Sequence, residues 1–235
     1  MTVIRPLSGF PAVLLFLAAF FAPAGAARAG ESFEDVPAAI DSQAKYLFYM
    51  HGKIVEDEGR YAFHPVYGPY QYDDIVKALA ARGFVVISEV RDYVAKGAYA
   101  RKVAGQVKKL IAAGVAPANI TVIGHSKGGF ITMLAAAGLG NRNLNFVNMA
   151  GCGKGSGFGK GFRKFVARDA SRLQGRILSL YDSSDQIAGS CRRAFEKAAG
   201  NVESKEIVFD TGEGHGLFYG PEKIWIDEVV KWADR

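Results

Sequence analysis

Ser126 is the residue whose surroundings in the sequence point most clearly to chemistry. It lies within Gly124–Gly128, which reads GHSKG and matches the pattern G-x-S-x-G. The β-branched run Ile120–Ile123 comes directly before this stretch, and the small-residue helical pattern Ile131–Ala137 follows it. A serine on a sharp turn between a strand and a helix is strained, and its hydroxyl projects from the sheet edge as a nucleophile. The alternative is a small-residue turn in an ordinary βαβ unit.

The neighbours of Ser126 also predict how a reacting carbonyl could be stabilised. Glycine is favoured at positions 124 and 128 because a Cβ there would collide with the adjoining strand and helix. The backbone N–H of Lys127 would lie at a helix N-terminus, where it can face a developing oxyanion. The turn is therefore suited to acyl transfer.

The composition limits the classes of protein to be considered. The chain has 235 residues, of which 49% are hydrophobic and 22% are charged, as in ordinary globular domains. This length suits a single domain that buries a substantial core without disulfides. Although the net charge is +6, no dense block of Lys and Arg is interleaved with aromatic residues, so nucleic acid is not an expected partner.

The first 29 residues have the features of a signal peptide. Arg5 precedes the apolar run Leu7–Phe21, which is short for a membrane-spanning helix and is interrupted by Pro11. Two A-x-A sequences end at Ala26 and Ala29, and either suits cleavage. An uncleaved N-terminal anchor is the alternative. We expect export to the periplasm or the exterior, with residues 30–235 as the mature domain and no stable membrane span within it.

From Lys45 onward, strand and helix signals alternate. Short apolar, β-branched runs predict strands, and amphipathic periodicity predicts helices. The expected strands are Tyr46–Met50, Phe84–Ser88, Ile120–Ile123, Asn145–Met149, Arg176–Tyr181 and Glu206–Phe209. The expected helices are Tyr72–Arg82, Tyr99–Ala113, Ile131–Ala137, Cys191–Ala199 and Glu222–Ala233. This alternation predicts an α/β fold in a single domain, with a mostly parallel sheet flanked by helices on both faces.

Residues 151–175 do not fit this alternation. Glycine occupies alternate positions at first, and basic residues follow, but no window matches the phosphate-binding patterns G-x-G-x-x-G or G-x-x-x-x-G-K-[ST]. We expect a flexible crossover that leads into a short solvated helix. The alternative is a small lid over a pocket, whose basic residues would favour an anionic substrate.

Three short motifs, taken with this order of elements, resemble the α/β-hydrolase fold superfamily. They are HG at His51-Gly52 after the first strand, GHSKGG at Gly124–Gly129, and GHG at Gly214–Gly216 near the end. The resemblance covers Lys45 to the C-terminus. It implies a shortened version of the fold without the two leading antiparallel strands, and it does not identify a substrate.

The resemblance also implies the order nucleophile, acid, histidine along the chain. His215 is the histidine that follows both Ser126 and an acid-bearing strand end, and it lies in the loop Thr211–Gly216. Its imidazole could take the serine proton near neutral pH and return it to the leaving group. Asp185, in a turn before an apolar residue, is the expected acid that orients His215, and Asp182 at the strand end is the alternative.

The HG motif resembles the oxyanion loop of the superfamily. By this analogy the backbone N–H of Lys53 is a second oxyanion donor beside that of Lys127. The polar segment Lys53–Gly68 is expected to be a loop, and its carboxylates Glu56–Glu58 are expected to be solvated. No His or Cys accompanies them at ligand spacing, so neither a metal nor a cofactor is predicted.

Together these residues predict an exported serine hydrolase that acts on small ester-like molecules. Ser126 would attack the carbonyl, His215 would transfer the proton, and water would release the acyl group. Thioesters, amides or transfer to an alcohol would use the same groups. The competing class is a catalytically silent relative that binds a ligand or a partner in the same cleft.

The two cysteines, Cys152 and Cys191, are too far apart for a CxxC motif. Each follows the end of one of two consecutive strands, which are expected to be neighbours in the sheet. An exported protein meets an oxidising compartment that tends to pair cysteines. We therefore predict a Cys152–Cys191 disulfide, which would tie the glycine-rich crossover to the loop of Asp185.

Overall fold

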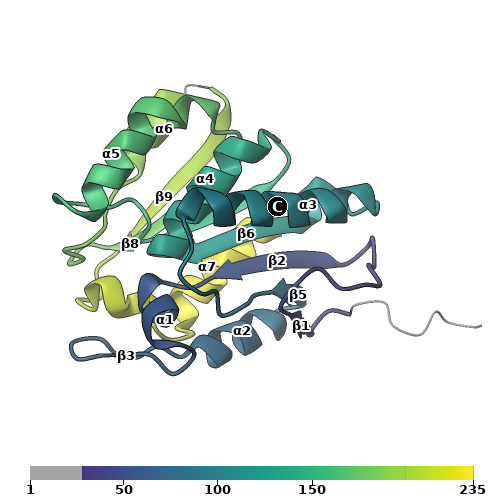
Figure 1. Cartoon of the computed structure of the whole chain (residues 1–235), viewed down its shortest axis with the longest axis horizontal. Helices are drawn as coiled ribbons and strands as arrows, with labels where there is room; N and C mark the ends of the chain where they lie inside the picture. Colours follow the sequence, from purple (N-terminus) through teal and green to yellow (C-terminus); the bar gives the residue numbers. More distant parts are fainter. Residues whose placement is uncertain (1–27, 199, 235) are drawn as a thin grey trace, which may run out of the picture.

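The structure is a computed structural model that describes residues 28–198 and 200–234. Residues 1–27 of the predicted signal peptide therefore lie outside the described residues. The described chain forms one large sheet with helices packed on both sides (Figure 1). Within these ranges, no helix combines the length and the apolar character that crossing a membrane requires.

Seven strands form the central sheet in the order β1-β5-β2-β6-β7-β8-β9, and every neighbouring pair is parallel. The strands are β1 (Ser32–Phe33), β2 (Lys45–Met50), β5 (Phe84–Ile87), β6 (Ile120–His125), β7 (Asn145–Met149), β8 (Gly175–Asp182) and β9 (Val202–Phe209). The central strands are rich in apolar residues, and β5 is wholly apolar, because both of their faces are buried. The predicted α/β class with a mostly parallel sheet is confirmed.

The strand order marks one edge of this sheet as the expected place of a ligand site. From β2 the chain crosses to β5 on one side, whereas β6, β7, β8 and β9 follow one another on the other side. The order therefore reverses between β2 and β6, and open α/β sheets bind ligands at the carboxyl ends of the strands at such a point. His51 and Ser126 directly follow these two strand ends.

Helices cover both faces of the sheet (Figure 1). On one face the core receives buried residues from α3 (Lys96–Ala112), α4 (Lys127–Leu139), α5 (Phe158–Arg168) and α6 (Arg192–Ala198). On the other face it receives them from α2 (Tyr72–Ala80) and α7 (Lys223–Ala233). The remaining helical segments are α1 (Lys53–Glu58) and the 3-10 helices η1 (Pro117–Asn119), η2 (Ala170–Arg172) and η3 (Gly214–Phe218).

Besides the unpredicted strand β1, two segments differ from the sequence-based expectation. The predicted loop at residues 53–68 begins with α1 and continues into a small antiparallel pair, β3 (Phe63–His64) and β4 (Gly68–Pro69). In the crossover at residues 151–175, α5 is not simply solvated, because its Phe162 and Phe165 are buried in the core. Phe158, Phe162 and Phe165 share one helical face, a pattern that the intervening glycines and cations obscured.

Candidate active site

Ser126 occupies a sharp turn between β6 and α4. Its backbone has φ 54° and ψ −114°, a positive φ that residues with a Cβ rarely adopt. The Ser126 N–H donates a hydrogen bond of 2.8 Å to the Met149 carbonyl at the end of β7. Strain of this kind persists only where the surrounding structure fixes it, and it is frequent at functional sites. The expected strand–turn–helix setting of Ser126 is present.

Glycines let three backbone segments meet around this turn. A Cβ on Gly124 would lie 2.4 Å from the backbone carbonyl carbon of Gly128. A Cβ on Gly128 would lie 2.1 Å from the Met50 carbonyl oxygen, at the end of β2. Both distances are far inside van der Waals contact, so only glycine fits. As a result, the N-terminus of α4 packs directly against the ends of β2 and β6.

Ser126, His215 and Asp185 form one continuous hydrogen-bonded chain. The Ser126 Oγ lies 2.8 Å from Nε2 of His215, and the His215 Nδ1 lies 2.8 Å from Oδ2 of Asp185. His215 is carried by η3, and Asp185 lies in the loop after β8. Both side chains are buried, with 5% and 0% of their surface exposed. The carboxylate accepts a hydrogen bond from Nδ1–H, which leaves the unprotonated Nε2 free to take the hydroxyl proton of Ser126.

Asp185 is held as a carboxylate by several donors. Its Oδ1 accepts hydrogen bonds from the backbone N–H groups of Ile187 (2.7 Å) and Ala188 (2.9 Å). Burial acts to raise the pKa of Asp185, but the hydrogen bond and charge of His215, together with these two amides, outweigh it and lower the pKa. Asp185 is therefore ionised and can stabilise a positive charge on His215.

Asp182, the alternative acid, has a different set of partners. Its Oδ1 accepts from the N–H and the hydroxyl of Ser184, and its Oδ2 accepts from the N–H and the hydroxyl of Thr211. Burial acts to raise its pKa, but these four hydrogen bonds prevail and lower the pKa to about 2. Asp182 thus connects the loop that carries Asp185 to the segment that leads into His215.

Two further histidines are buried near the site and are neutral. His51 donates from Nδ1 to the Gly52 carbonyl (2.8 Å) and accepts at Nε2 from the Arg91 N–H (2.9 Å). Burial and the charge of Arg91 lower its pKa to about 3. The ring of His125 lies 4.8 Å from that of His215, centroid to centroid, and burial holds the pKa of His125 well below its usual range. Neither is placed to take the serine proton.

The two expected oxyanion donors lie at two helix N-termini. Lys127 is the first residue of α4, and Lys53 is the first residue of α1. The first N–H groups of a helix have no intrahelical acceptor, so these amides are available to a ligand. Gly52, which precedes Lys53, is held by a hydrogen bond of 3.3 Å from its N–H to the Tyr70 hydroxyl. Both amides lie just past the ends of β2 and β6, where the strand order reverses.

Glu56 was expected to be solvated, and this expectation is wrong. Its carboxylate is buried between the side chains of Arg91 and Lys127. These partners lie 35 and 71 residues away in the sequence, so no local spacing could have revealed the cluster. Among the described residues, no group of three or more His, Cys, Asp or Glu side chains could hold a metal ion.

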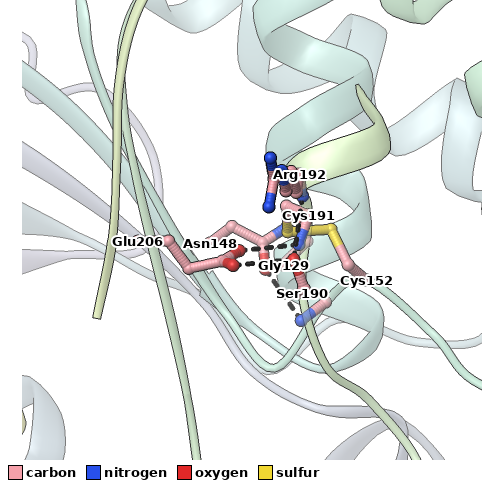
Figure 2. Close-up of a disulfide and its surroundings, with 8 residues drawn as sticks. Gly129, Asn148, Cys152, Ser190, Cys191, Arg192 and Glu206 are labelled. Atoms are coloured by element: carbon pink, nitrogen blue, oxygen red, sulfur yellow. Dashed lines mark hydrogen bonds between the residues drawn. A yellow bond between two sulfur atoms is a disulfide. The ribbon is translucent and has the colours of Figure 1, made fainter. Parts of the chain in front are cut away.

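Cys152 and Cys191 form a disulfide, as predicted, with their Cα atoms 5.3 Å apart (Figure 2). The carboxylate of Glu206 on β9 accepts from the Cys191 N–H and the Ser190 hydroxyl, both at 2.7 Å. Next to the disulfide, Lys154 donates from Nζ to the Asp185 carbonyl oxygen (2.7 Å). The start of the glycine-rich crossover is therefore fastened to the loop that carries Asp185.

Comparisons with solved structures identify the fold. A putative dienelactone hydrolase from Klebsiella pneumoniae aligns with a TM-score of 0.55 at 15% identity, over 85% of this chain and 90% of that chain. A monoacylglycerol lipase from Paleococcus ferrophilus aligns with a TM-score of 0.54 at 15% identity, over 80% and 93%. Est1E from Butyrivibrio proteoclasticus, solved with ferulic acid bound, aligns with a TM-score of 0.53 at 12% identity, over 81% and 88%.

No protein-family model and no curated protein sequence matches the chain. The structural likeness nevertheless establishes that this chain has the α/β-hydrolase fold. The sequence predicts a shortened version of this fold that lacks its two leading antiparallel strands. In agreement, every strand of the large sheet in the described residues is parallel to its neighbours.

Proposed function

We propose that this protein is an exported serine hydrolase that cleaves ester-like bonds in small molecules. The observation that carries this proposal is the hydrogen-bonded chain from the Ser126 hydroxyl through His215 to Asp185. A nucleophile, a base and an orienting acid in this arrangement are the parts that acyl transfer requires. The fold supports the same chemistry, because it is shared with proteins named as a putative dienelactone hydrolase, a monoacylglycerol lipase and an esterase/lipase from an uncultured bacterium.

In the first half of the reaction, His215 Nε2 takes the proton of Ser126 as Oγ attacks the carbonyl carbon. The carbonyl oxygen becomes an oxyanion, which the backbone N–H groups of Lys127 and Lys53 stabilise. Asp185 stabilises the imidazolium of His215. When the tetrahedral intermediate collapses, His215 gives its proton to the leaving alcohol, and the acyl group remains on Ser126.

In the second half, water replaces the alcohol. His215 takes a proton from the water molecule, whose oxygen attacks the acyl carbon, and the same amides stabilise the second oxyanion. Collapse returns the proton to Ser126 Oγ and releases a carboxylic acid. A thioester or an amide would follow the same steps with a thiol or an amine as the leaving group.

Two observations support export. The first 29 residues have the charge, the apolar run and the A-x-A sequences of a cleavable signal peptide. The disulfide between Cys152 and Cys191 is a bond that forms and persists in oxidising compartments. N-terminal sequencing of the exported protein reads the site of cleavage, and an uncleaved Met1 there would contradict cleavage after Ala26 or Ala29. Finding the protein only in the cytoplasm would contradict export itself.

The activity can be tested with a fluorophosphonate probe and with p-nitrophenyl esters of increasing acyl length. We expect the purified protein to be labelled and to hydrolyse at least the short esters. Mass spectrometry of the labelled protein should place the adduct on Ser126. Absence of both labelling and hydrolysis would favour a silent relative that binds a ligand at the same site.

A further inference from the structure

A buried ion cluster lies beside the site and takes no part in the proton transfers. Glu56 pairs with Lys127 through Oε1 and with Arg91 Nε through Oε2, the latter at 3.2 Å. The side chains of Glu56, Lys127 and Arg91 are 0%, 8% and 2% exposed. Apolar residues of similar volume would often stabilise such a position at least as well as buried charges do. A role beyond packing is therefore expected.

The cluster joins the two segments that carry the proposed oxyanion donors. Lys127 supplies one donor through its own backbone N–H at the start of α4. Glu56 lies on α1, which begins at Lys53, the source of the other donor. Arg91 donates from Nη2 to the His51 carbonyl oxygen (2.6 Å), which fixes the backbone just before Lys53. All three charged side chains thus act on the same two helix starts.

The loop after β5 closes the cluster. The Val94 N–H donates to Glu56 Oε1 (3.2 Å), and the Val94 carbonyl accepts from Lys127 Nζ (3.1 Å). The ammonium group of Lys127 also lies over the ring of Tyr93, 4.9 Å from the ring centroid. The Lys127 side chain therefore has partners on α1 and on this loop, and Glu56 is the group that binds both cations.

We propose that Glu56 is a positioning residue that holds the backbone N–H groups of Lys127 and Lys53 in the arrangement that an oxyanion needs. This inference rests on the proposed function, because the donors matter only if an oxyanion forms at Ser126. Oxyanion donors accelerate a reaction when they are preorganised around the place where the charge develops. An ion pair that links the two donor segments supplies that preorganisation.

A purely electrostatic role would change the rate in the opposite direction. The cluster contains two cations and one anion, so replacing Glu56 by Gln raises its net charge by one positive unit. Additional positive charge near an oxyanion would stabilise it and raise the rate. Loss of positioning would lower the rate. The sign of the effect on kcat therefore separates the two roles.

The experiment compares Glu56→Gln with wild type on two substrates, p-nitrophenyl acetate and p-nitrophenyl thionoacetate. In the second substrate, sulfur replaces the carbonyl oxygen. We expect kcat on the oxygen ester to fall roughly 10- to 100-fold, with KM nearly unchanged, because the donors act mainly in the transition state. Sulfur is a larger and weaker hydrogen-bond acceptor than oxygen, so wild type should turn over the oxygen ester faster than the thiono ester. This preference for the oxygen ester should be smaller in Glu56→Gln. A merely structural defect would lower both rates equally and leave that preference unchanged.

Asp57→Asn is the matched control. Asp57 is the next residue of α1 and pairs with the exposed Lys53 side chain, and its own side chain is 43% exposed. We expect this variant to keep the wild-type kcat and the wild-type preference for oxygen. An equal loss in both variants would show that α1 is merely sensitive to substitution and would overturn the proposal.

Glu56→Leu tests the same contact if Glu56→Gln does not fold, because an apolar side chain of similar volume is often tolerated at the place of a buried charge. Like Glu56→Gln it removes the negative charge, so a loss of kcat and of oxygen preference again indicates positioning and not electrostatics. Unchanged or raised kcat in a folded variant refutes positioning by Glu56 while the proposed function stands. If neither variant folds, the cluster serves the fold alone and the proposal fails. An inactive wild type would instead remove the proposed function itself.

Discussion

Asp182 ends strand β8 and Asp185 lies in the loop that follows it, yet only Asp185 reaches His215. Asp185 Oδ2 lies 2.8 Å from His215 Nδ1. Both carboxylate oxygens of Asp182 instead accept hydrogen bonds, from Ser184 and from Thr211. Asp185 therefore contacts the imidazole of His215, whereas Asp182 holds the loop that carries Asp185.

Asparagine substitutions should separate these two roles. Asp185→Asn removes the charge that stabilises the imidazolium and disturbs the tautomer of His215, so kcat should fall by about 10³-fold or more. Asp182→Asn should lower kcat far less, because Asp182 does not contact His215. Steady-state kinetics of both folded variants measure this difference, and equal losses or the reverse order would move the orienting role to Asp182.

If the proposed function is right, replacing Ser126 or His215 should abolish turnover without unfolding the protein. Ser126→Ala and His215→Ala should each lower kcat by several orders of magnitude, roughly 10⁴ to 10⁶-fold. The double variant should lose little more than either single variant, because the two residues act as a unit. Circular dichroism and thermal unfolding serve as the control for folding. Substantial activity in a clean preparation of Ser126→Ala would rule out Ser126 as the nucleophile.

Asp182 should also make stability depend on pH in the acid range. Its pKa is about 2 in the folded protein, against an ordinary value of 3.8. Because the folded-state pKa is the lower one, the stabilisation is fully present above the unfolded pKa, at about pH 5 and higher, and is lost as the pH falls toward 2. This difference in pKa corresponds to about 2 kcal/mol of unfolding free energy at neutral pH.

Urea unfolding of wild type and Asp182→Asn at several pH values measures this contribution. The difference in unfolding free energy should be about 2 kcal/mol near neutral pH and below about 1 kcal/mol near pH 2. A difference that stays constant over this range would show that the carboxylate contributes through its shape and not through its ionised hydrogen bonds.

The disulfide should contribute to stability through the unfolded chain. Cys152 and Cys191 are separated by 39 residues, and closing a loop of this length is worth about 3–4 kcal/mol. The double variant Cys152→Ser/Cys191→Ser should lose about that much unfolding free energy in urea. Thiol titration of the denatured, unreduced protein should find no free thiol. Two free thiols per chain would show that the disulfide does not form in the folded protein.

Gly128 and Gly138 both lie in α4, and alanine substitutions at the two positions test how closely the chain is packed beneath Ser126. A Cβ at Gly128 meets the Met50 carbonyl at 2.1 Å, whereas a Cβ at Gly138 has nothing within 4 Å. Gly128→Ala should destabilise the protein by about 3 kcal/mol or more and lower activity. Gly138→Ala should stabilise it by up to about 1 kcal/mol, because alanine favours a helix. Thermal unfolding of both variants checks the opposite signs.

Much of the fold could be predicted because its signals are local. The inner strands are rich in apolar residues because both of their faces are buried, and the expected strand at Asn145–Met149 agrees with β7 at both ends. The strand β1 was missed because its two residues are too few for a pattern. Helix α1 was missed because its polar residues show no amphipathic repeat over so short a length.

The sequence by itself determined the α/β class, the turn at Ser126, the place of His215 in the chain and the pairing of the cysteines. Each depends on residues close in sequence or on the order of parallel strands. The tertiary structure alone decided that Asp185 and not Asp182 meets His215, and that Glu56 is buried between Lys127 and Arg91. Ångström-scale distances between side chains from separate loops depend on how those loops pack, and no local pattern encodes that packing.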